Sequence, residues 1–158
     1  MHQRYPSYHY HYHHYCSYYK NDSRNKYGYP QVVGDFEEKF KKKFGMKYAL
    51  SMNSGTSAIH AALFAVGVKK NDEVITTPIS FVATTGAIAH IGAKPVYVDT
   101  GKDLNIDPEL IEKAITIKTK AIVPVHWSGK IAEMDSIMKI SKKHNIPVIE
   151  DSAQTMGA

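Results

Sequence analysis

The sequence has one cysteine, Cys16, and no apolar run that approaches the roughly 18 residues of a membrane-spanning helix. A single cysteine excludes an intramolecular disulfide framework. No basic segment leads into an apolar one at the start of the chain, as a secretory signal peptide would require. These absences predict a soluble, cytoplasmic protein with no membrane partner.

Two phosphate-binding motifs are also missing, and charge of one sign is only slightly in excess. Neither GxGxxG nor GxxxxGKS/T occurs, which argues against a dinucleotide-binding fold and against a P-loop. The 20 basic and 15 acidic residues give a net charge of +5. Residues 1–30 hold +3 of it, so the rest of the chain is near neutral. We therefore expect no nucleic-acid partner.

Residues 1–30 lack leucine, isoleucine and valine and form a low-complexity segment. They contain nine of the eleven tyrosines and five of the nine histidines. Without aliphatic periodicity such a segment cannot build a core, so we expect a disordered tail. A transition metal could bind adventitiously to the histidines and the cysteine of this segment, His9, His11, His13, His14 and Cys16. Their spacing matches no structural zinc pattern, and we predict no dedicated metal site.

From Gly34 onward the chain alternates helical and strand patterns, which predicts one α/β domain. Phe36, Phe40 and Phe44 recur every four residues and Gly45 follows, as in an amphipathic helix with a glycine stop. The expected helices are 36–44, 56–68, 80–91, 108–115 and 133–144, and the expected strands are 48–52, 73–77, 95–99, 121–126 and 147–151. Several strands are apolar at consecutive positions, which favours a mostly parallel sheet covered by helices on both faces.

Ligands of such sheets bind outside the carboxyl ends of the strands, and three turns there are polar. Residues 53–57 read NSGTS and enter a helix, so backbone N–H groups and hydroxyls could hold a phosphate, or simply cap the helix. Phe81 follows the next strand and could lie beside the same ligand, or be a core phenylalanine. Asp151 ends a very apolar strand, where it could serve a ligand or cap a helix.

Four stretches together resemble one known family. They read NSGTSAIHAAL, DEVITTPISFVATTGAIAHIGAKPVYVD, TKAIVPVHWSG and IPVIEDSAQTMGA. In their amino-acid sequences and their order along the chain they resemble the DegT/DnrJ/StrS family of pyridoxal-phosphate-dependent sugar aminotransferases. This family has the type I fold of aspartate aminotransferase. The resemblance covers about residues 31–158.

The resemblance implies a role for particular residues. Asp151 would pair with the protonated pyridine nitrogen of pyridoxal 5'-phosphate (PLP) and so keep the ring able to accept electrons. Gly55, Thr56 and Ser57 would hold the phosphate. The other implied contacts are Phe81 against the ring face, Gln154 at the phenolic oxygen, and His126 as a supporting residue behind the site.

The resemblance also implies a Schiff-base lysine well downstream of the EDSAQ motif, and the last lysine here is Lys143. Lys143 belongs to a solvated helix face and is not a candidate. We expect residues 31–158 to be the N-terminal portion of an incomplete large domain, without the small C-terminal domain. We also expect this chain to be inactive by itself, because both covalent attachment and proton transfer need that lysine.

The resemblance implies that the complete enzyme moves an amino group from glutamate to a keto group of a nucleotide-activated deoxysugar and is a homodimer. Two alternatives stay open. One is a PLP-dependent sugar dehydratase of the same family, in which histidine replaces the lysine. The other is a non-catalytic chain, either truncated or regulatory.

Overall fold

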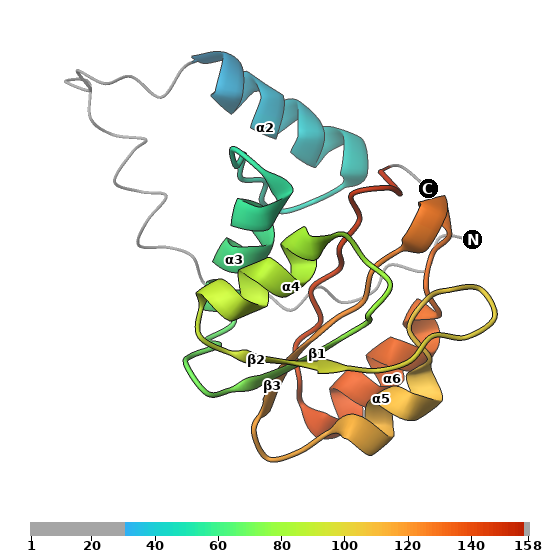
Figure 1. The fold of residues 1–158 in the computed structure, drawn as a ribbon. Coiled ribbons are helices and arrows are strands. Elements are labelled where there is room, and N and C mark those ends of the chain that lie inside the picture. The colour runs from blue at the N-terminus through green and yellow to red at the C-terminus, as the bar shows by residue number, and fades with distance from the viewer. Residues whose placement is uncertain (1–30, 157–158) are drawn as a thin grey trace. The chain divides into compact units, whose positions relative to one another are not determined.

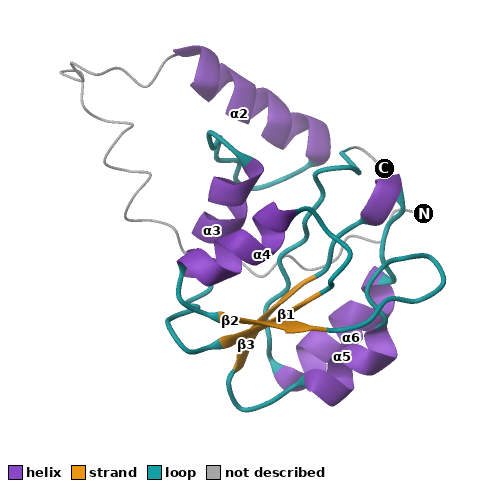
Figure 2. Ribbon diagram, in the orientation of Figure 1, coloured by secondary structure: helices purple, strands orange, loops and turns teal. Residues whose placement is uncertain are grey.

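A computed structural model describes residues 31–156 (Figure 1, Figure 2). They fall into two compact units that divide between Ser51 and Met52, and each unit is described by itself. The predictions made for residues 1–30 lie outside the described residues. Within the described part of the chain, no helix is long and apolar enough to cross a membrane.

The first unit contains α2 (Gln31–Phe44), which confirms the predicted phenylalanine-spaced helix. The rings of Phe40 and Phe44 lie 4.5 Å apart between centroids, as expected for side chains four residues apart on one helix face. Gly45 follows with φ of +65°, the left-handed conformation in which glycine commonly ends a helix.

The predicted strand at 48–52 is wrong. These residues form neither a strand nor a helix, and Tyr48 and Leu50 are exposed. A strand needs a neighbour for its backbone N–H and C=O groups, and none of residues 31–156 pairs with this segment. Ser51 instead donates its backbone N–H to Glu37 Oε1 at 2.6 Å. Apolar composition alone does not make a strand without a partner.

The second unit is built on a parallel sheet of β1 (Glu73–Thr76), β2 (Lys94–Tyr97) and β3 (Thr119–Val123), in the order β2-β1-β3. These three strands were predicted. The predicted strand at 147–151 runs parallel beside β3 but forms only two isolated bridges, Ile122–Val148 with β3 itself and Val125–Asp151 beyond the end of β3.

The second unit also confirms the other predicted helices, with ends shifted by up to three residues. They are α3 (Gly55–Ala65), α4 (Val82–His90), α5 (Pro108–Ala114) and α6 (Met134–His144), and a short 3-10 helix, η1 (Trp127–Gly129), lies between β3 and α6. Asp107 accepts a hydrogen bond from the Glu109 backbone N–H, as its predicted N-cap role before Pro108 requires.

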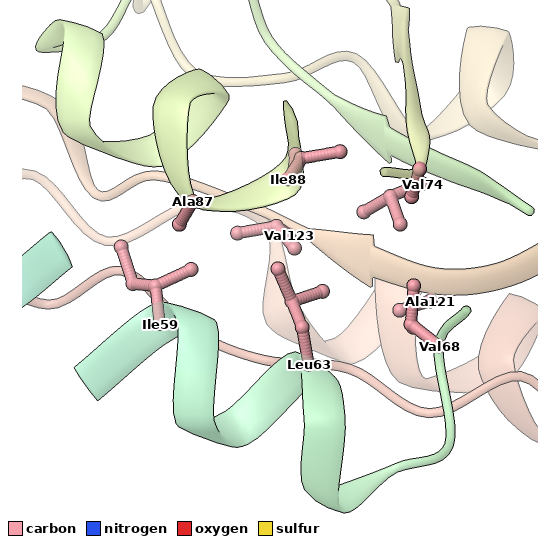
Figure 3. Close-up of a cluster of buried hydrophobic side chains, with 9 residues drawn as sticks. Ile59, Leu63, Val68, Val74, Ala87, Ile88, Ala121 and Val123 are labelled. Carbon is pink, nitrogen blue, oxygen red and sulfur yellow. The ribbon is translucent and has the colours of Figure 1, made fainter. Parts of the chain in front are cut away.

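Helices cover both faces of the sheet, which confirms the expected α/β architecture. Alternate strand residues point to opposite faces, so Val74 belongs to one cluster and Ile75 to the other. The first cluster joins β1 and β3 to α3 and α4 (Figure 3). The second joins the same strands to Ile111 of α5 and Ile137 of α6.

The direction of α3 brings its N-terminus to the carboxyl ends of the strands. Ile59, near the start of α3, lies toward Val123 at the end of β3, whereas Val68, beyond the end of α3, lies toward Ala121 (Figure 3). The helix therefore runs antiparallel to β3. Its first turn, Gly55 to Ser57, consequently points toward the carboxyl ends of the strands, where parallel sheets bind ligands.

Candidate functional site

Asp151 lies at the same carboxyl edge, held by its backbone beside the extension of β3. Its N–H donates to the carbonyl oxygen of Pro124 at 2.9 Å, and its own carbonyl accepts from the His126 N–H at 3.2 Å. The side chain is only partly buried. No helix begins between Asp151 and Met156, so the helix-cap alternative for this carboxylate does not hold for the described residues.

Each carboxylate oxygen of Asp151 accepts one hydrogen bond. Thr84 Oγ1 donates to Oδ2 at 2.7 Å, and the Ala153 backbone N–H donates to Oδ1 at 3.3 Å. An ionised carboxylate has about four acceptor positions, so two donors leave capacity for a third from outside the chain. The carboxylate is thus held in place and still able to accept.

Sequence reasoning assigned no role to Thr84 or Ser80, which the structure connects to Asp151. The Ser80 and Thr84 hydroxyl oxygens lie 2.7 Å apart. Thr84 is fully buried in the first turn of α4. The sequence showed only two hydroxyl residues in one strand-to-helix turn, and Ser80 precedes the N-cap Phe81, outside the helix itself. What they contact there could not be deduced from the sequence.

At the start of α3, Ser54 is the N-cap and accepts from the Ser57 N–H at 3.1 Å. The cap interpretation of this turn is therefore correct for Ser54 and Ser57. A helix provides no internal acceptor for its first N–H groups, so those of Gly55 and Thr56 remain for another molecule. A Cβ built on Gly55 would meet nothing within 4 Å, which leaves room for that molecule to approach the backbone.

Phe81 is the N-cap residue of α4, and its side chain is 74% exposed. The core interpretation of this phenylalanine is wrong, because the ring contributes to neither hydrophobic cluster. Its neighbour Val82 is 71% exposed as well. An exposed aromatic ring at the start of α4, in the connection that follows β1, is available to stack on a planar ligand.

His126 is buried, with both ring nitrogens hydrogen-bonded. Nδ1 accepts from the Ala132 backbone N–H at 3.2 Å, so the second hydrogen bond, from Nε2 to Glu150 Oε2 at 2.9 Å, has the imidazole as donor. This arrangement requires the neutral tautomer with its proton on Nε2. His126 therefore supports the end of β3, and its predicted supporting role behind the site stays a prediction.

Gln154 is exposed, but its amide has a defined orientation. Its Oε1 accepts from the Ser128 backbone N–H at 2.6 Å, which leaves the Nε2 hydrogens to donate elsewhere. Ser128 lies in the turn of η1 and has φ of +51°, an uncommon conformation for a residue other than glycine.

Buried Asn105 braces that turn. Its Oδ1 accepts from the Trp127 N–H at 2.9 Å, and its Nδ2 donates to the Lys130 carbonyl at 3.1 Å. Nδ2 also donates to Asp103 Oδ2 at 3.0 Å, and this side-chain hydrogen bond lowers the pKa of Asp103 below its ordinary value. Sequence analysis did not select Asn105, because no local pattern shows that it reaches a turn more than twenty residues away.

The sequence model of the DegT/DnrJ/EryC1/StrS aminotransferase family matches residues 20–158. The chain belongs to this family. The match begins at residue 20, so it extends further toward the N-terminus than the resemblance we placed at residues 31–158.

Some of the similar proteins have names that specify a sugar nucleotide. The UDP-2-acetamido-2-deoxy-3-oxo-D-glucuronate aminotransferase of Pseudomonas aeruginosa is 46% identical over 130 residues, which cover 82% of this chain and 36% of that protein. The chain spans about a third of the length of the curated relatives it matches, from 32% to 36%.

Solved structures of type I PLP enzymes share the fold. NtdA of Bacillus subtilis, solved with the cofactor PMP, has a TM-score of 0.78 and 40% identity over 79% of this chain and 29% of its own. A GDP-4-keto-6-deoxymannose-3-dehydratase, solved with a PLP-glutamate geminal diamine, has a TM-score of 0.74 and 34% identity over 80% of this chain and 34% of its own.

The donor and acceptor set at the carboxyl edge fits PLP. A carboxylate with spare acceptor capacity suits a protonated ring nitrogen, and a capped helix start beside an open glycine suits a phosphate. The free amide hydrogens of Gln154 suit an anionic oxygen. Among residues 31–156, no group of three or more histidine, cysteine, aspartate or glutamate side chains gathers that could hold a metal ion.

Proposed function

We propose that this chain supplies the ring-nitrogen and phosphate contacts of a PLP-dependent aminotransferase that acts on a keto group of a nucleotide-activated deoxysugar. The observation that carries the proposal is the geometry of Asp151. Its carboxylate is fixed by two donors at the carboxyl edge of a parallel sheet, and the N-terminus of α3 points to that edge.

When bound, PLP supplies a conjugated ring that accepts the electron pair released at the amino-acid Cα. Asp151 holds a proton at the ring nitrogen, because a carboxylate beside the nitrogen stabilises its protonated form. A ring with this proton is the better electron acceptor, so removing the carboxylate lowers the rate of the chemical step. Asp151 is the catalytic residue that this chain contributes.

The start of α3 binds the phosphate in this proposal. Gly55 and Thr56 present backbone N–H groups, the Thr56 hydroxyl adds a donor, and the positive end of the helix dipole favours the negative charge. Ser57 takes part less directly, because its N–H already donates to Ser54. Its hydroxyl, 3.0 Å from that of Ser54, extends the polar surface of the turn.

Two exposed side chains orient the ring. Phe81 lies against one face and limits its tilt by stacking. Gln154 donates from Nε2 to the phenolic oxygen, since Ser128 occupies its carbonyl oxygen. His126, through its hydrogen bonds to Ala132 and Glu150, keeps the segment that follows β3 in place beside Asp151.

The remaining parts of the activity come from outside these residues. A lysine for covalent attachment and proton transfer is required, and the residues proposed for the site include none. We infer that glutamate is the amino donor, that the full enzyme is a cytoplasmic homodimer, and that this chain alone does not transaminate.

A sugar dehydratase is the second candidate, because a dehydratase structure matches this chain over 80% of its length. The aminotransferase and the dehydratase share the part of the fold seen here, and the residue at the lysine position separates them. A non-catalytic truncated or regulatory chain remains the alternative outside enzyme chemistry.

The activity test uses a chimera in which residues 31–158 replace the matching segment of the Pseudomonas aeruginosa relative, whose remaining residues complete the chain. We expect the chimera to convert PLP to pyridoxamine phosphate with glutamate. Asp151→Ala should reduce the rate of this half-reaction by at least about a hundredfold, because the carboxylate no longer stabilises the charge of the transition state. Glu109→Ala, which removes an exposed carboxylate on α5, is the matched control and should have no effect.

The 158-residue chain is assayed beside the chimera. We expect no saturable half-reaction and no stoichiometric borohydride labelling of one lysine, as shown by peptide mapping. A chimera that is folded and binds PLP but is insensitive to Asp151→Ala would contradict the proposed function. Saturable turnover by the chain alone would contradict the inferred inactivity.

A further inference from the structure

Thr84 is a buried hydroxyl residue whose only proton is committed to Asp151. An ionised carboxylate only accepts, so in the 2.7 Å contact Thr84 Oγ1 must be the donor to Asp151 Oδ2. In the 2.7 Å contact between the two hydroxyls, Thr84 is then the acceptor and Ser80 the donor. The direction of the chain of hydrogen bonds is therefore Ser80 to Thr84 to Asp151.

This use of a helical threonine differs from the usual one. Threonine in a helix commonly donates to the carbonyl three or four residues earlier. Here the hydroxyl of Thr84 leaves its own helix and crosses to a residue 67 positions later in the sequence. Ser80 has a second acceptor within reach, the Phe81 carbonyl at 3.2 Å, but the Thr84 contact is shorter.

We propose that Thr84, itself held by Ser80, is the positioning residue that sets the orientation of the Asp151 carboxylate toward the ring nitrogen of the cofactor. This rests on the proposed function. With Thr84 on Oδ2 and the Ala153 N–H on Oδ1, the carboxylate cannot rotate without losing one of two hydrogen bonds. A carboxylate that is already fixed loses less conformational entropy when it binds a donor, so the ring nitrogen is bound more tightly.

The test compares two ligands that differ only at the ring nitrogen. Fluorescence titration gives dissociation constants of the full chain for pyridoxamine phosphate and for an analogue in which a C–H group replaces that nitrogen. The ratio of the two constants isolates the contact to Asp151, because phosphate and stacking contacts are common to both ligands. The nitrogen-15 chemical shift of labelled pyridoxamine phosphate reports the protonation of the ring independently.

Thr84→Val removes the hydroxyl at nearly constant volume, and we expect it to lower the preference for the nitrogen-containing ligand about threefold to tenfold. The bound nitrogen-15 signal should move toward that of the unprotonated ring. Thr84→Ser keeps the hydroxyl and should keep both readouts. Thr85→Val is the matched control, since the Thr85 hydroxyl contacts Tyr97 rather than Asp151.

An unchanged ligand preference in folded Thr84→Val would overturn the proposal, and so would an equal loss in Thr85→Val. If Thr84→Val does not fold, Ser80→Ala decides: it should lower the preference about twofold, and no change would overturn the proposal. A wild-type chain that binds both ligands equally, or neither, contradicts the proposed function itself and with it the role of Thr84. The two failures are therefore distinguishable.

Discussion

At the scale of single residues, the polar groups near Asp151 leave little freedom in how protons are placed. His126 must be neutral to accept from Ala132, Thr84 must donate to a carboxylate, and Gln154 must turn its carbonyl oxygen toward Ser128. Each assignment follows from counting donors and acceptors, and at the buried groups of His126 and Thr84 an unmade hydrogen bond would be costly.

His126 provides a stability test of this counting. His126→Ala leaves the buried Ala132 N–H without an acceptor, and we expect the free energy of unfolding to fall by about 2 kcal/mol or more. Glu150→Ala removes only the half-exposed partner of the other ring nitrogen and should cost less than about 1 kcal/mol. Urea unfolding of both variants measures the difference; equal losses would contradict the dominant role of the buried contact.

Residue types at strand ends could be predicted, but their partners could not. Asp151 and the 53–57 turn stand out because they follow apolar strands, where ligands bind parallel sheets. The contact from Thr84 to Asp151 depends on how α4 packs against the sheet, and no local pattern encodes that. Phe81 shows the same limit: its spacing suited the core, whereas the helix presents it to solvent.

At the scale of elements, predictions succeeded where a segment carries its own signal. Asp107 and Pro108 mark the start of α5, and Gly45 marks the end of α2. Segment 48–52 failed because a strand is defined by its neighbour. Segment 147–151, which has fewer apolar residues, does have one: Val148 pairs with Ile122 of β3, and Asp151 pairs with Val125 just beyond the end of β3.

The contact between α5 and α6 contains a pH-sensitive ion-pair cluster. Glu112 Oε1 accepts from His144 Nε2 at 2.9 Å and from Lys143 Nζ at 2.6 Å. These hydrogen bonds lower the pKa of Glu112 below its ordinary value, and the one from His144 has the larger effect. Because the pKa of Glu112 is lower in the folded state, its ion pairs contribute to the free energy of unfolding. This contribution is fully present above the ordinary carboxyl pKa and is lost as the pH falls through the lowered pKa.

Glu112→Gln should therefore lower the melting temperature at pH 7 by only about 1 to 3 °C, because exposed ion pairs contribute little. The gap between wild type and variant should close as the pH is lowered through the carboxyl range. Differential scanning calorimetry at several pH values measures it. Glu109→Gln, on the same helix, is the control, and a gap that widens in acid would contradict the assigned sign.

At the scale of the whole molecule, the start of α3 and the carboxylate of Asp151 lie at the same edge of the sheet. Almost a hundred residues separate them in the sequence. The alternation of helices and strands predicted this architecture. The chain belongs to the family whose model matches residues 20–158, and it spans about a third of the length of the curated relatives it matches.

The central claim is that Gly55, Thr56 and Asp151 bind one molecule of cofactor. Proton–nitrogen-15 correlation spectra of the labelled chain, recorded during titration with pyridoxamine phosphate, test it most directly. We predict that the amide signals of Gly55, Thr56, Asp151 and Ala153 shift together and fit one dissociation constant, and that inorganic phosphate shifts only the first two. Signals of Gly55 and Asp151 that saturate at different concentrations, or an Asp151 signal that does not respond, would contradict a shared site.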